Sequence, residues 1–214
     1  MAAFDLEEQE QLAEIRAWWD KWGNLITMTV VVLAVVVVGW RLWNWYGNSK
    51  ATEASVYYSA LIKAVETNDT QKIREASGIL AEKYSGTAYG ELSALLAAKA
   101  QAEAGDKASA KSKLEWAADK ASDPLIRDLA RLRLAALLID EKAYDAAIKQ
   151  LSTKPADAFV PRYADLRGDA LVAAGKPADA KAAYKEAIDV LAKDQGGQQM
   201  KGMIELKLDA LGGV

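Results

Sequence analysis

The sequence lacks cysteine and histidine altogether, and its formal net charge is only −3. Without cysteine there is no disulfide and no thiol nucleophile, and without histidine there is no imidazole for acid–base catalysis. Because both residue types are absent, the usual zinc sites are excluded as well. Nucleic-acid-binding domains usually carry a positive net charge, whereas the net charge of this chain is slightly negative. We therefore expect a protein that is not an enzyme, with no cofactor, no bound metal and no nucleic-acid partner.

Charge is missing from one long stretch near the start of the chain. No charged residue lies between Lys21 and Arg41, and residues 25–40 read LITMTVVVLAVVVVGW. A helix of roughly 20 apolar residues crosses a hydrocarbon core of about 30 Å, whereas a buried strand is usually about 4 to 8 residues long. The sequence therefore predicts a transmembrane helix over residues 23–46, in contact with the lipid bilayer.

Six of the seven tryptophans flank this apolar run. Amphipathic rings favour the headgroup layers at the two ends of a membrane span, and a long arginine stem lets its guanidinium stay in water. We expect the anchor and its interfaces to be formed by Trp18, Trp19, Trp22, Trp40, Arg41, Trp43, Trp45 and Tyr46.

Residues 1–22 form an acidic leader, with six carboxylates against Arg16 and Lys21. A cleaved signal peptide begins with a short basic region instead, so we expect an uncleaved anchor. Apolar residues of the leader recur at helical spacing, which fits a helix lying on the membrane or docking a partner; a loosely ordered leader is the alternative. The basic residues on the two sides of the span are equal in number, so the positive-inside rule leaves the topology open.

Residues 47–214 show helical periodicity throughout, and the acidic and basic residues after Ser49 are equal in number. Thr87 and Asp123 are expected N-caps, and Pro124, Pro161 and Pro177 are expected in first helical turns. Gly105 and Gly175 stand where helices should end in a left-handed residue. The fold class predicted for the whole chain is all-α.

A repeat of about 34 residues runs through this part. Alanines 76, 110, 147 and 180 are spaced by 34, 37 and 33 positions, and Lys142 occupies the glycine position of a weaker copy. This period favours a tetratricopeptide-like α-solenoid over an ordinary helix bundle. We expect about four helix pairs and a C-terminal capping helix, whose apolar face would carry Met200, Met203, Ile204, Leu208 and Leu211. The expected repeat-packing residues are Gly105, Ala110, Leu114, Ala117, Ala147, Leu151, Gly168, Leu171, Gly175, Ala180, Tyr184 and Ala187.

The first helices of such pairs line the concave face of a solenoid, where a peptide groove is one interpretation and an ordinary solvated face is the other. The candidate groove residues are Tyr57, Tyr58, Arg127, Arg131, Arg162, Tyr163 and Arg167.

Three stretches stand out: EEQEQLAEIRAWWDKWGN in the leader, GWRLWNWY at the end of the span, and ADLRGDALVAAGK at residues 164–176. Together they resemble the YfgM family, the ancillary subunit of the SecYEG translocon. The resemblance covers essentially the whole chain. It implies a bacterial inner-membrane protein that crosses once, with a cytoplasmic N-terminus and periplasmic repeats. It also implies that the protein associates with SecYEG and with a membrane-anchored chaperone of the PpiD type.

The hypothesis that follows is tethering, in which the anchor holds the repeats beside the channel and the repeats meet emerging secreted or membrane client polypeptides or a chaperone. A scaffold or regulator that sequesters a signalling partner, through its leader, is the alternative.

Overall fold

The computed structural model describes residues 2–193 and 195–212, and in these ranges it contains α-helices, two short 3-10 turns and no strand. The predicted all-α class is therefore confirmed. The chain divides into two compact units, residues 1–49 and 50–214. Helix α1, Ala2–Glu66, supplies all the described residues of the first unit and the opening helical segment of the second.

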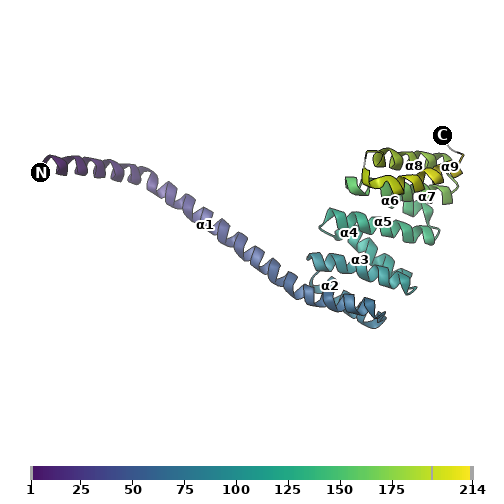
Figure 1. Cartoon of the computed structure of the whole chain (residues 1–214). Helices are drawn as coiled ribbons and strands as arrows, with labels where there is room; N and C mark the ends of the chain where they lie inside the picture. The colour runs from purple at the N-terminus through teal and green to yellow at the C-terminus, as the bar shows by residue number, and fades with distance from the viewer. Residues whose placement is uncertain (1, 194, 213–214) are drawn as a thin grey trace. The chain divides into compact units, whose positions relative to one another are not determined.

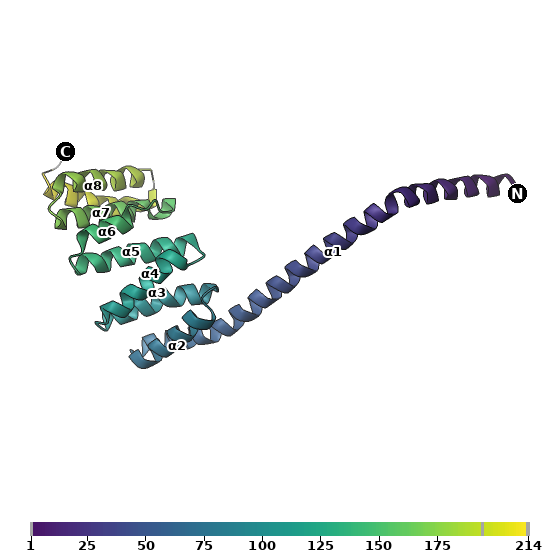
Figure 2. The ribbon, with the colours of Figure 1, turned by 180° about the vertical axis from the view of Figure 1, so that it is seen from behind.

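In the second unit, the helices follow one another and pack as successive antiparallel neighbours (Figures 1 and 2). The pairs are the last part of α1 with α2, α3 with α4, α5 with α6 and α7 with α8, and α9 packs on α8. The bounds are α2 Thr70–Lys83, α3 Ala88–Glu103, α4 Lys107–Lys120, α5 Pro124–Asp140, α6 Tyr144–Leu151, η1 Asp157–Phe159, α7 Val160–Ala173, α8 Pro177–Leu191, η2 Gln195–Gly197 and α9 Gln198–Ala210. This arrangement is the predicted solenoid of four pairs with a capping helix.

The predicted helix starts are confirmed. The side-chain oxygens of Thr87 and Asp123 accept hydrogen bonds from the backbone N–H groups of Gly90 and Leu125, which have no partner within their own helices. Pro124 begins α5, and the first turns of α7 and α8 each contain a proline. Proline suits these positions because its fixed φ is already helical and its missing N–H would be unsatisfied there in any case.

One tight turn closes the first helix of every pair. Gly105 and Gly175 have φ of 82° and 72°, as predicted, and Asn68 and Lys142 adopt the same left-handed conformation with φ of 53° and 61°. In each copy the N–H of the next residue donates to a carbonyl five positions earlier, over 2.8 to 2.9 Å. This bonding satisfies carbonyls at the helix end, and a side chain at φ > 0 costs about 1–2 kcal/mol that glycine avoids.

The core of the second unit consists of small side chains at helix crossings and larger ones between them. Leu61, Leu80, Leu134 and Leu151 are almost fully buried, as is Ile204 of the capping helix. Alanine lets two helix backbones approach closely, which explains why so alanine-rich a sequence still builds well-packed clusters of buried residues.

Candidate interaction sites

The apolar run predicted to span the membrane lies within α1. The stretch from Gln11 to Glu66 contains an 18-residue window with a mean hydropathy of 2.3, none of which is buried within the structure. Side chains from Val31 to Val38 are at least half exposed wherever they are large. A continuous apolar surface of this length is unfavourable in water and matches the hydrocarbon thickness of a bilayer. By length and composition this is the one candidate span among the described residues.

The aromatic residues predicted for the two interfaces are all exposed side chains of α1. Trp43 is the most exposed, at 81%, and Arg41 is exposed as well. At the leader side, the ring of Trp19 covers Gly23, and a Cβ at position 23 would lie 2.9 Å from that ring. The ammonium of Lys21 lies 5.8 Å from the ring centre of Trp22. The remaining members, Trp18, Trp40, Trp45 and Tyr46, are exposed in the same way, which suits contact with headgroups.

Most of the predicted repeat-packing residues lie at helix crossings. Gly168 of α7 faces the ring of Tyr184 of α8, and a Cβ at position 168 would overlap that ring. Gly105 and Gly175 are different, because no atom lies within 4 Å of a Cβ built on either one, so their role is conformational. The alanines and larger residues at buried positions are Ala110, Leu114, Ala117, Ala147, Leu151, Leu171, Ala180, Tyr184 and Ala187. In the capping helix Ile204 and Leu208 are buried, but Met203 is 59% exposed, so its expected place on the packed face is wrong.

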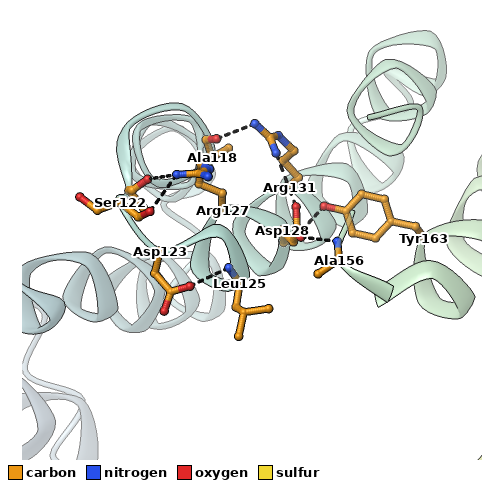
Figure 3. Close-up of polar contacts among 10 residues, drawn as sticks. Ala118, Ser122, Asp123, Leu125, Arg127, Asp128, Arg131, Ala156 and Tyr163 are labelled. Atoms are coloured by element: carbon orange, nitrogen blue, oxygen red, sulfur yellow. Dashed lines mark hydrogen bonds and ion pairs between the residues drawn. The ribbon is translucent and has the colours of Figure 1, made fainter. Parts of the chain in front are cut away.

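Tyr163 does not line a groove, and that expectation is wrong. Its side chain is 2% exposed, and its hydroxyl donates a 2.8 Å hydrogen bond to the backbone carbonyl of Asp128 (Figure 3). Burial raises the pKa of the Tyr163 hydroxyl, and the negative charge of Asp128 adds to the increase. An amphipathic tyrosine at helical spacing fits a core position as well as a surface position, so the sequence pattern could not separate the two.

Arg127 and Arg131 bind the end of the preceding helix. The guanidinium of Arg127 donates to the carbonyls of Ala121 and Ser122 over 2.6 and 3.0 Å, and that of Arg131 donates to Ala118 over 2.9 Å (Figure 3). These carbonyls lie in the last turn of α4 or just beyond it, where intrahelical partners are missing. Both arginines therefore join α5 to α4 and are not presented to a ligand.

The other candidate groove residues lie on two helices, α1 and α7. Tyr57 and Tyr58 are half-buried, with ring centres 5.7 Å from Tyr84 and 5.4 Å from Tyr89, respectively. Arg167 forms an ion pair with Glu186 of α8. Arg162 is exposed.

An open cleft of about 430 Å³ lies instead between α3 and α5. Leu114, Leu137 and alanines of both helices give it apolar walls, and charged residues stand around them. Three of these are already engaged: Lys99 lies 3.8 Å from Glu103, and Arg133 donates to the carbonyl of Leu95. The lining is Ala98, Lys99, Ala102, Glu103, Leu114, Arg133, Ala136, Leu137 and Asp140. Sequence reasoning missed this cleft because its alanines look the same as alanines that pack helices.

Two buried carboxylates, also missed from the sequence, connect neighbouring pairs. Glu91 of α3 accepts from the N–H of Ser122 over 2.5 Å. Asp128 of α5 accepts from the N–H of Ala156 over 2.8 Å, as Figure 3 shows. Each carboxylate accepts a hydrogen bond from the loop that leads into the next helix pair, so it fixes the position of that pair relative to the one before it. Glu91, Asp128 and Asp165 are 37 positions apart, and this spacing is the signal that could have found them.

The third acid of this series anchors the capping helix. The ammonium of Lys207 in α9 lies 2.8 Å from both Asp165 and Asp169 of α7, and the hydroxyl of Tyr184 donates to Asp169 over 2.7 Å. Burial raises the pKa of Asp165, although the hydrogen bond from Lys207 opposes the increase. The group is thus a satisfied polar contact among three helices.

The fold and the exposed apolar helix define a class: a single-pass membrane protein with a tetratricopeptide-like domain. A family model described as a tetratricopeptide repeat-like domain matches residues 16–213, and the chain belongs to that family. Curated relatives extend over nearly the full length. The protein of Haemophilus influenzae is 27% identical over 98% of this chain and 100% of the relative. The protein of Neisseria gonorrhoeae is 26% identical over 98% of this chain and 99% of the relative. The protein of Escherichia coli is 26% identical over 95% of this chain and 96% of the relative.

Each of these relatives is named an ancillary SecYEG translocon subunit. The resemblance to the YfgM family inferred from the sequence is therefore confirmed. The same relatives, with the one long apolar helix, support a single-pass protein of the inner membrane.

Proposed function

We propose that this chain is a non-catalytic binding module that accompanies the SecYEG translocon and links the channel to a PpiD-type periplasmic chaperone and to emerging client polypeptides. The observation that carries the proposal is the covalent continuity of α1, which joins a lipid-suited span to a tetratricopeptide-like domain. The names of the full-length relatives supply the association with the channel. Residues 1–22 are then the cytoplasmic leader, and residues 47–214 form the periplasmic domain.

The mechanism is tethering. A domain attached to a span beside the channel is confined near the exit, so its effective concentration there is high without any strong contact. Weak and rapidly reversible binding is then sufficient, which suits a protein that must release each chain as it folds or moves on.

The cleft between α3 and α5 is the surface we assign to this binding. Its apolar walls suit the side chains that an unfolded segment exposes. The balanced charges around it favour no strongly acidic or basic sequence, and they suit a varied set of clients.

Co-purification in a mild detergent from native membranes tests the proposal. The full chain, tagged at its C-terminus, is compared with a variant in which residues 1–46 are replaced by an unrelated span of the same orientation. We expect SecYEG and a PpiD-type chaperone to accompany the full chain. Loss of the channel on the exchange would place that contact in the leader and span, and retention would place it in the repeats.

If neither the channel nor a chaperone accompanies the full chain, the proposal fails. Recovery of a cytoplasmic signalling protein, lost when the leader is exchanged, would favour the scaffold interpretation in its place.

A further inference from the structure

A second pocket lies on a different part of the repeat domain, where α2, α4 and the end of α3 meet. It has a volume of about 480 Å³, within the range of small-ligand sites. Its lining is more polar than that of the cleft between α3 and α5, and it consists of Arg74, Gln101, Ala108, Ser109, Ser112 and Lys113. Arg74 and Gln101 also line a small cavity of about 20 Å³ next to it.

Gln101 carries the one buried side-chain oxygen without a hydrogen-bond partner among the described residues. The residue is only 6% exposed. A buried carbonyl oxygen left unpaired costs about 1–3 kcal/mol, and such groups stand out in native structures. Because Gln101 lines both cavities, a ligand that enters the pocket lies beside this side chain and can offer it an N–H group.

Lys113 is the second residue of the pocket whose side chain has a polar group without a partner among the described residues. Its side chain is half-buried, and it forms no ion pair or hydrogen bond within the described part of the chain. Burial lowers the pKa of its ammonium. A cation that is partly removed from water without a counter-charge is stabilised when an anion binds beside it.

The remaining charges of the pocket cancel. The guanidinium of Arg74 lies 3.0 Å from the carboxylate of Asp106, which also accepts from the N–H of Ser109 over 3.2 Å. The pocket therefore offers one uncompensated positive charge, that of Lys113. One charge matches a carboxylate better than a phosphate dianion, which is bound best by several arginines.

We propose that this pocket binds an acidic residue of a partner polypeptide, with its carboxylate at Lys113 and a backbone amide at Gln101. A peptide unit has both an N–H and a C=O, so it satisfies the Gln101 amide in either orientation. The hydroxyl of Ser112, which also lines the pocket, supplies a further donor to the carboxylate. This site is separate from the cleft between α3 and α5, and it stands whether or not the chain accompanies a translocon.

The test uses the ¹⁵N-labelled full chain in detergent micelles and three probes: acetyl-Ala-Ala-Glu-Ala-Ala-amide, the same peptide with glutamine in place of glutamate, and sodium acetate. We expect saturable shifts of the Gln101, Ser109, Ser112 and Lys113 amide signals with the glutamate peptide. Binding of the glutamine peptide should be at least tenfold weaker because its side chain carries no charge. Binding of acetate should be weaker by a similar factor because acetate has no N–H group.

Variants then separate the pocket from the general surface. Lys113→Met should weaken the glutamate peptide at least tenfold, Lys113→Arg should retain binding within about threefold, and Lys120→Met, which removes an exposed lysine of the same helix, should leave it unchanged. The amide spectrum of each variant reports its folding.

The comparison of peptides in the unaltered protein needs no variant and can overturn the proposal by itself. Equal affinity for the glutamate and glutamine peptides, equal binding of acetate, shifts confined to another surface, or no saturable shift would each do so.

Discussion

Gly168 of α7 lies directly against the aromatic ring of Tyr184 of α8, so closely that a Cβ at position 168 would occupy the space of the ring. The ring is itself fixed, because its hydroxyl donates to Asp169 and the ammonium of Lys207 lies 5.8 Å from its centre. The close packing of α7 against α8 therefore requires glycine at position 168 to make room for the ring of Tyr184.

Replacing Gly168 with alanine should destabilise this pair by about 1–3 kcal/mol, because the Tyr184 ring must leave its position in a packed core. Hydrogen exchange of the α7 and α8 amides in the full chain measures the effect locally. The matched control is Gly78→Ala in α2, where nothing lies within 4 Å of the new Cβ. That change should stabilise α2 by about 0.5–1 kcal/mol. Equal effects of the two substitutions would contradict the close contact.

Lys142 occupies a left-handed position that glycine fills in two of the other pairs. Lys142→Gly should stabilise the protein by about 1 kcal/mol, since it relieves the strain of a side chain at φ > 0. Gly175→Ala should destabilise it by a similar amount, with no clash involved. Urea unfolding followed by circular dichroism measures both, and a destabilised Lys142→Gly variant would refute the argument.

Asp128 should matter for stability although it lines neither of the two proposed binding sites. Asp128→Ala leaves the N–H of Ala156 without its acceptor, and we expect a loss of about 1–3 kcal/mol. Asp128→Asn keeps an acceptor oxygen and should lose less. Asp119→Ala, an exposed acid at the end of α4, is the control and should change the free energy of unfolding by less than about 0.5 kcal/mol.

Asp106 should make part of the stability depend on pH. Hydrogen bonds from Ser109, together with the nearby guanidinium of Arg74, lower the pKa of the Asp106 carboxyl in the folded protein. A lowered folded pKa means that the stabilisation is present above the unfolded value of about 3.9 and is lost as the pH falls below it.

Thermal unfolding of the full chain and of Asp106→Asn between pH 7 and pH 3 checks this sign. The difference in Tm between the two proteins should be largest near pH 7 and should shrink toward pH 3. A difference that grows on acidification would show that the assigned direction is incorrect.

The repeat architecture could be predicted from the sequence because helix ends and crossings have local signatures. Thr87 predicts the start of a helix because it can cap the backbone N–H groups there, and Gly105 predicts the end of one because it adopts a positive φ readily. The alanine period predicts where paired helices cross. The binding surfaces could not be predicted in the same way. Arg131 and Arg162 lie on equivalent first helices, yet one binds the end of α4 and the other is exposed, and only tertiary packing distinguishes them.

The buried polar groups show the same limit. Glu91 and Asp128 read as ordinary charges of a helix surface, because their partners are backbone N–H groups about 30 residues away. The unpaired oxygen of Gln101 has no sequence signature at all.

The most direct test of the central claim is photo-crosslinking in native membranes, with benzoylphenylalanine at Ala136 in the cleft and, as a control, at the exposed Asp119 outside it. Our account predicts crosslinks from position 136 to a secreted chain or to a PpiD-type chaperone while translocation is active, and few from position 119. If position 136 crosslinks to no translocation component while the protein is present at its normal level, the cleft between α3 and α5 is not the binding surface beside the channel.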